Sequence, residues 1–177
     1  MTGETGVETR AAGRFPPWSA DHARSVVAPL LPQRGALMPM LHALQRAFGY
    51  IDAQALPLLA ELLNLSVAEV HGVATFYRDF RDAAPKGPIL RLCRAEACQA
   101  VGSEALAEHA QRSLAAAGPT AAWELDAVYC LGNCALGPSA TLDGRLHARL
   151  DPARLDALLA DARLSGATPA DPREARA

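Results

Sequence analysis

The chain has 177 residues, with 17 lysines and arginines against 19 aspartates and glutamates, so its formal net charge is −2. Its single lysine and its arginines are scattered rather than gathered into a basic stripe, which argues against nucleic acid and anionic membranes as partners. No apolar run reaches the ~20 residues of a membrane-spanning helix, and the polar N-terminus is unlike an export signal. We therefore expect no membrane span and a cytoplasmic location.

Composition and patterning divide the chain into four parts. Residues 1–17 hold few large apolar side chains, which predicts a flexible lead-in. From 18 to 84 the apolar residues recur at helical spacing, which predicts a helical domain. A cluster of prolines and a glycine then marks a boundary, and strands alternate with helices over 85–163. Residues 164–177 are again poor in apolar groups, and we expect a flexible tail.

Three short helices are predicted in a row within the helical domain. The first can end at Gly49, because glycine adopts the left-handed conformation without steric cost. Asp52 can cap the second by accepting hydrogen bonds from unpaired amides of its first turn. The third begins at a capping box formed by Ser66 and Glu69. Its apolar spacing favours a core position for Phe76, while for Tyr77 and Phe80 both the core and a docking edge for a partner chain stay open.

The segment 85–163 predicts a small mixed sheet with helices packed on it. Asp143-Gly144 suits the tight turn of a hairpin. Pro138 stands just before a strand, where thioredoxin-like folds often hold a cis-proline, although trans is the usual form of an X-Pro bond. The predicted order is a strand over 89–92, a helix over 103–117, a strand over 123–129, a hairpin of strands over 140–142 and 146–150, and a helix from Asp151. This β-α-β-β-α order is that of thioredoxin-like folds, so the predicted fold class is α+β.

The four cysteines form two close pairs, Cys93 with Cys98 and Cys130 with Cys134. Each pair begins where a predicted strand runs into a loop, so two strand ends on one edge of the sheet can bring the four sulfurs together. Four thiolates suit either a tetrahedral zinc ion or a [2Fe-2S] cluster, and spacing alone leaves both open. A dithiol oxidoreductase is disfavoured, because neither pair has the C-x-x-C spacing.

Four segments of the chain together resemble one known family. They are ALMPMLHALQRAFGYID, LLNLSVAEVHGVATFYRDF, LRLCRAEACQAVG and VYCLGNCALGPSATLDGRLHARLDPARLDALL. The chain resembles the small [2Fe-2S] subunit of NADH-linked electron-transfer modules, a family shared by respiratory complex I, bidirectional nickel-iron hydrogenases and NAD-dependent formate dehydrogenases. The resemblance covers roughly residues 20–162. The loop from Cys93 to Gln99 is most similar to the gamma subunit of cytosolic formate dehydrogenases that use molybdenum or tungsten.

The resemblance implies an N-terminal helical bundle followed by a thioredoxin-like [2Fe-2S] ferredoxin domain. It places Cys93 and Cys98 on one iron of the single cluster and Cys130 and Cys134 on the other. The chain would be a non-catalytic electron-transfer subunit of an NAD-dependent oxidoreductase. It contains no dinucleotide fingerprint or phosphate loop, so nicotinamide and flavin are expected on another chain.

The partners that the resemblance implies are two. One is a flavoprotein subunit that holds FMN, a [4Fe-4S] cluster and the NADH site. The other is the catalytic formate dehydrogenase subunit, which contains molybdenum or tungsten. Two alternatives remain: the equivalent subunit of an NADH:quinone oxidoreductase or NAD-reducing hydrogenase, and a zinc-stabilised interaction module with no redox role.

Other candidate residues are weighed against simpler roles. Positive charge on Arg94 and the amides near Gly132 would raise the potential of a cluster, because reduction makes the cluster more negative. We expect Glu96 to be an exposed loop carboxylate and His71 to lie at the surface or in an interface, not on a metal.

Overall fold

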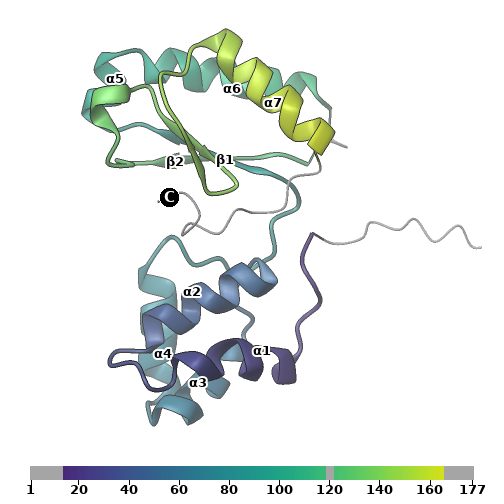
Figure 1. The fold of residues 1–177 in the computed structure, drawn as a ribbon, viewed down its shortest axis with the longest axis vertical. Helices are drawn as coiled ribbons and strands as arrows, with labels where there is room; N and C mark the ends of the chain where they lie inside the picture. The colour runs from purple at the N-terminus through teal and green to yellow at the C-terminus, as the bar shows by residue number, and fades with distance from the viewer. Residues whose placement is uncertain (1–13, 119–121, 166–177) are drawn as a thin grey trace, which may run out of the picture. The chain divides into compact units, whose positions relative to one another are not determined.

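The computed structural model describes residues 14–118 and 122–165, with side chains to 162, and the chain divides after Ala83 into two compact units (Figure 1). The first unit is helical and the second contains the sheet. Residues 1–13 of the lead-in predicted for 1–17, and residues 166–177 of the tail predicted for 164–177, lie outside the described residues. No helix among the described residues is long and apolar enough to cross a membrane.

The first unit consists of short helices around an apolar core. They are α1 (Ala20–Val27), the 3-10 turn η1 (Ala28–Leu30), α2 (Leu37–Phe48), α3 (Ala55–Leu63) and α4 (Val67–Phe76). The largest side chains that this core buries completely are Val27, Met40, Leu41, Leu44, Phe48, Leu59 and Val70. Phe15, which belongs to the predicted lead-in, lies against this unit, because a Cβ on Gly49 would come within 2.5 Å of its ring.

Two of the three helix ends predicted from capping residues in this unit are found in the structure. Gly49 ends α2 in the left-handed conformation, with φ 82°, as predicted. The capping box of Ser66 and Glu69 at the start of α4 is also confirmed. Asp52 is not the N-cap residue of α3, which begins at Ala55 after Gln54. Its Oδ1 instead accepts the amide of Gln54 at 2.8 Å, just before the helix.

Phe76 is where the prediction for α4 is wrong. Its spacing from Val70 and Val73 places it on one apolar stripe, and Val70 is fully buried. The side chain of Phe76, however, is 78% exposed. The helix ends at Phe76, whose ring meets that of Tyr77 at 5.1 Å between centroids instead of entering the core.

The second unit is a four-stranded sheet in the order β2-β1-β3-β4. Its strands are β1 (Ile89–Cys93), β2 (Glu124–Val128), β3 (Ala140–Leu142) and β4 (Arg145–His147), and its helices are α5 (Glu96–Ala100), α6 (Ser103–Ala116), the 3-10 turn η3 (Cys134–Leu136) and α7 (Pro152–Ser165). The long helices α6 and α7 cover one face of the sheet (Figure 1). Leu90 and Leu92 of β1 are buried beneath them together with Leu155 and Leu159 of α7. The α+β class is thus confirmed.

Strand pairing places the ends of β1 and β2 at the same edge. β1 pairs in parallel with β2, Cys93 opposite Val128, and antiparallel with β3. The turn between β3 and β4 has φ 50° at Asp143 and φ 86° at Gly144, as predicted for a tight hairpin. The Gly137–Pro138 peptide bond is cis, contrary to the usual form of such a bond.

The half-buried His147 of β4 gives the second unit a pH dependence. Burial, and to a lesser degree the charge of Arg145, lowers the pKa of His147 below its usual value of 6.5. The unfolded chain therefore takes up a proton at a higher pH than the folded chain does. We expect the free energy of unfolding to be fully developed above pH 6.5 and to decline as the pH falls below it. Denaturant unfolding of wild type and His147→Gln at several pH values checks this, and equal pH slopes for the two proteins would refute it.

Candidate metal centre

The four cysteines lie at one edge of the sheet because two neighbouring parallel strands end there. Cys93 is the last residue of β1, and Cys130 follows β2 by two residues. The partners come from short helical turns, Cys98 from α5 and Cys134 from the start of η3. The backbone holds the edge together: the Arg94 amide donates to the Val128 carbonyl at 2.8 Å, and the Cys93 amide donates to the Ser139 carbonyl at 2.9 Å.

The second pair has the spacing of two ligands on one metal ion. The Sγ atoms of Cys130 and Cys134 are 3.7 Å apart. Two corners of a tetrahedron with metal–sulfur bonds of about 2.3 Å lie about 3.8 Å apart. The amide of Gly132 donates to Cys130 Sγ at 3.3 Å, and Cys130 itself has φ 103°, in the left-handed region that non-glycine residues rarely occupy. The loop is thus held in a conformation that directs the Gly132 amide at the Cys130 sulfur.

The first pair is buried, unlike the second. Cys93 is 2% and Cys98 1% exposed, whereas Cys130 and Cys134 are both exposed. Burial alone would raise the pKa of Cys93, but hydrogen bonds from the Ala95 backbone, from Cys98 and from the Cys130 and Leu131 backbone outweigh it and lower the pKa. The site is therefore built to stabilise a thiolate inside the protein, which is the form that binds metal.

Neighbouring thiols also raise the pKa values of Cys98 and Cys134. Burial, followed by the hydrogen bond with Cys93, raises the pKa of Cys98, and the amide of Ser139 opposes this. The hydrogen bond with Cys130 is the main reason why the pKa of Cys134 is raised, and the charge of Cys93 adds to it. The raised pKa values of Cys98 and Cys134 mean that these two thiols need a nearby cation if they are to become thiolates.

The four thiols come as two pairs at one edge of the sheet. A mononuclear zinc site takes four thiolates at one point. A [2Fe-2S] cluster needs only two thiolates per iron, because the sulfides supply the rest, and the chain offers the thiolates in pairs.

Sequence reasoning missed two neighbours of the cysteines. Arg94 donates to Glu104 of α6 through both Nε and Nη2, with Nε 3.0 Å from Oε1, so its charge is partly compensated. Ser139, after the cis-proline, contacts the first pair through its backbone on both sides. Neither partner follows a local pattern, since each reaches its cysteine through tertiary pairing. Glu96 and His71 are exposed, as expected.

Gly137 packs directly against the first pair. A Cβ at this position would lie 3.2 Å from Cys98 Sγ and 3.1 Å from Val101 Cγ2. We expect Gly137→Ala to displace the Cys98 thiol and to lower the iron and sulfide content of the purified chain. The comparison is Gly35→Ala, where no atom lies within 4 Å and only the positive φ is strained. Equal iron content in the two variants would show that contact at Gly137 is unimportant.

Known proteins match the chain across both units. The family described as thioredoxin-like [2Fe-2S] ferredoxin matches residues 23–163. A subunit of the NADH-quinone oxidoreductase of Rhizobium meliloti is 36% identical over 72% of this chain and 78% of its own length. The NADP-reducing hydrogenase subunit HndA of Solidesulfovibrio fructosivorans is 28% identical over 74% of this chain and 80% of its own.

A solved structure agrees with these sequence matches. An NAD+-reducing [NiFe]-hydrogenase in its H2-reduced state matches with a TM-score of 0.62 and 27% identity over 73% of this chain. The match spans only 22% of that hydrogenase chain, so the similar region is one part of a much longer polypeptide there. The resemblance seen in the sequence is therefore confirmed, and the chain belongs to the thioredoxin-like [2Fe-2S] ferredoxin family, together with the small subunits of NADH-linked electron-transfer complexes.

Proposed function

We propose that the chain carries one [2Fe-2S] cluster, with Cys93 and Cys98 on one iron and Cys130 and Cys134 on the other. The observation that carries this proposal is the pairing of the sulfurs at one sheet edge, with the second pair 3.7 Å apart. When bound, such a cluster supplies transfer of one electron at a time. The protein's own part is to stabilise the thiolates with backbone amides and to keep one pair buried and the other exposed.

The division between a buried and an exposed pair suits electron transfer between chains. The buried pair keeps solvent from one side of the site, and the exposed pair brings the other side to the surface, where a partner can approach. The large apolar side chains Tyr129 and Leu136, beside the exposed cysteines, are 71% and 38% exposed. Aromatic and apolar side chains around a redox site are typical of a contact surface.

The complex we propose is a cytoplasmic NAD-dependent formate dehydrogenase. In it, this chain pairs with a flavoprotein subunit that holds FMN and binds NADH, and a catalytic subunit with molybdenum or tungsten oxidises formate. The support is the similarity of the loop from Cys93 to Gln99 to the gamma subunit of such enzymes. A second candidate is the equivalent position in an NADH-quinone oxidoreductase or a nickel-iron hydrogenase, which the names of the matching proteins favour.

The test is to purify the complex from its native host by a tag on this chain, without oxygen. We expect NAD+ reduction with formate, and with neither hydrogen nor a quinol as the electron donor. Metal analysis should find molybdenum or tungsten in the same preparation. Activity with hydrogen or quinol and none with formate would replace the proposed enzyme by the second candidate.

A further inference from the structure

An ion pair lies next to the buried pair of cysteines. Arg94 directly follows Cys93, and Glu104 lies in the first turn of α6. The guanidinium of Arg94 donates to both carboxylate oxygens of Glu104, from Nε to Oε1 at 3.0 Å and from Nη2 to Oε2. A guanidinium that meets a carboxylate at two points forms a strong ion pair with a fixed geometry. The charge of Arg94 is therefore held in one place.

The backbone of Arg94 is held as firmly as its side chain. Its amide donates to the Val128 carbonyl of β2 at 2.8 Å, and its carbonyl accepts the side-chain amide of Gln99 at 2.9 Å. Gln99 directly follows Cys98, the second member of the buried pair, so this hydrogen bond closes the loop that carries both cysteines. Arg94 is thus bonded to the sheet, to the ligand loop and to α6 at the same time.

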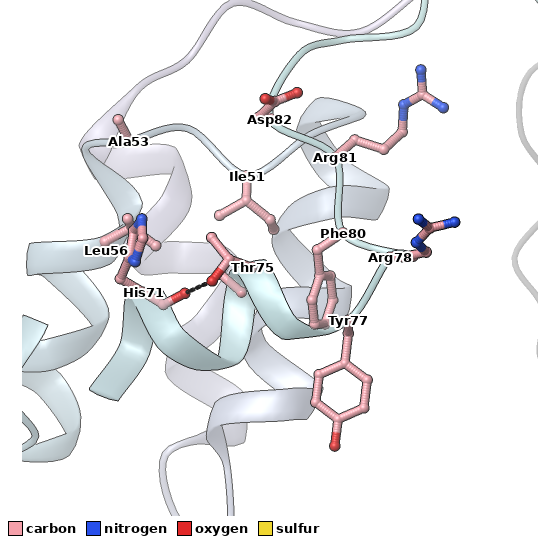
Figure 2. Close-up of a pocket in the computed structure, with 11 residues that line it drawn as sticks. Ile51, Ala53, Leu56, His71, Thr75, Tyr77, Arg78, Phe80, Arg81 and Asp82 are labelled. Atoms are coloured by element: carbon pink, nitrogen blue, oxygen red, sulfur yellow. Dashed lines mark hydrogen bonds between the residues drawn. The ribbon is translucent and has the colours of Figure 1, made fainter. Parts of the chain in front are cut away.

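Other arginines of the chain show a looser arrangement. Arg112 of α6 approaches Glu108 only to 4.0 Å, and the two side chains are 70% and 73% exposed. Figure 2 shows Arg78 extending outward from the segment that follows α4. The side chains of Arg94 and Glu104 are only 40% and 45% exposed. Water therefore screens the Arg94–Glu104 pair less than it screens an ordinary surface pair, and the bidentate geometry adds to its strength.

The charge of Arg94 is close to the second ligand loop as well as to the first. The hydrogen bond with Glu104 is the main reason why the pKa of Arg94 is raised, and the charge of the Tyr129 phenol adds a smaller contribution. Tyr129 directly precedes Cys130, and the Arg94 amide is bonded to the residue before Tyr129. Any net charge on the Arg94–Glu104 pair therefore acts on the edge of the sheet where both cysteine pairs lie.

We propose that Glu104 sets the reduction potential of the cluster through Arg94, as a positioning residue that holds the guanidinium and compensates its charge. Reduction adds one negative charge to a [2Fe-2S] cluster, so nearby positive charge raises the potential and nearby negative charge lowers it. This inference rests on the proposed function, which supplies the cluster. A simpler role for Glu104 is to stabilise α6, because a carboxylate in the first turn interacts favourably with the helix dipole. That role alone would leave the potential unchanged.

Opposite shifts of the potential in two single variants test the proposal. The midpoint potential is measured by EPR-monitored redox titration of the full-length chain at low ionic strength. Glu104→Gln leaves the charge of Arg94 uncompensated, and we expect the potential to rise by at least about 30 mV. Arg94→Gln leaves the charge of Glu104 instead, and the potential should fall by a similar amount. A shift of about 30 mV is a threefold change in the equilibrium constant of one-electron reduction, because a tenfold change corresponds to about 59 mV.

Two further variants separate charge from shape. In the double variant Arg94→Gln, Glu104→Gln both charges are absent, so the potential should return close to that of wild type. Arg94→Lys keeps the charge without the fork of the guanidinium and should also stay close to wild type. The matched control is Glu108→Gln, which makes the same substitution beside Arg112, one turn further along α6, and should cause no shift. The EPR signal reports only chains that hold the cluster, so lower loading of a variant does not alter its measured potential.

Added salt gives an independent check. The Glu104→Gln shift should shrink as the ionic strength rises, because the pair is partly exposed. An unchanged potential in Glu104→Gln, or a shift that salt does not reduce, would overturn the proposal. Shifts of both single variants in the same direction, with no recovery in the double variant, would do the same, since they would show that the pair only maintains the shape of the loop. These outcomes leave the proposed function standing, whereas a wild-type chain without a [2Fe-2S] signal would refute both.

Discussion

Replacing Cys93 by alanine is expected to abolish cluster binding. The sequence contains four cysteines, so no spare thiol can take the place of a lost ligand. Cys93 accepts hydrogen bonds from the Ala95, Cys130 and Leu131 backbone, and thereby links the first ligand loop to the second. Its loss leaves one iron with a single protein ligand and leaves these amides without an acceptor. The iron and sulfide content of the anaerobically purified variant should fall from about two atoms of each per chain to near zero.

Cys130→Ser is the informative companion to this variant. Cys130 is exposed, so a serine there can be reached by water and can still offer an oxygen ligand. We expect a partly occupied, less stable cluster with altered absorption, in contrast to the complete loss in Cys93→Ala. Full iron and sulfide content in Cys93→Ala would show that the buried pair does not bind the cluster.

Gly87→Ala is expected to destabilise the second unit strongly. A Cβ on this buried glycine would lie 2.2 Å from the carbonyl oxygen of Ala122 and 2.8 Å from its carbon. Both atoms belong to the backbone that leads into β2. A hydrogen bond holds this backbone close to the start of β1, because the Glu124 amide donates to the Pro88 carbonyl at 3.0 Å. The backbones of β1 and β2 must therefore separate at their starts. We expect the free energy of unfolding to fall by about 2 to 4 kcal/mol.

The two tryptophans allow this loss to be assigned to one unit. Trp18 packs on the core of the helical unit and Trp123 on that of the sheet unit. In a Trp18→Phe background, fluorescence during urea unfolding reports the sheet unit alone. The matched control is Gly72→Ala in α4, where no atom lies within 4 Å. It should stabilise the helical unit by about 0.5 to 1 kcal/mol and leave the Trp123 transition unchanged. An unchanged Trp123 transition in Gly87→Ala would contradict the close contact.

The parts of the fold that were predictable are those fixed by neighbouring residues. The left-handed Gly49, the capping box at Ser66 and the turn at Asp143-Gly144 follow from the local chemistry of the backbone. The short helix α5 was not predicted. Its span of Glu96–Ala100 is only five residues, too short to show a helical repeat. The first ligand pair is therefore joined by a helical turn where the sequence predicted a plain loop.

The features that were not predictable depend on what covers a side chain. The spacing of Phe76 from Val70 and Val73 suggested one apolar stripe, but Phe76 lies about 120° around the helix from Val70, so spacing alone does not bury its side chain. The pairing of Arg94 with Glu104 likewise depends on how α6 packs at the end of β1. The cysteine pairs were located correctly from two strand ends, because the parallel pairing of β1 and β2 brings those ends to one edge. That the first pair is buried and the second exposed is visible only in the structure.

The measurement that tests the central claim most directly is an absorption and EPR spectrum of the full-length chain, purified without oxygen, before and after reduction with dithionite. Iron, sulfide and zinc are determined on the same sample. We predict a brown protein that bleaches on reduction and gains a rhombic signal of one spin per chain, with about two iron and two sulfide atoms. A colourless, EPR-silent protein that holds one zinc ion and no sulfide, and that does not gain the signal on cluster reconstitution, would contradict the account.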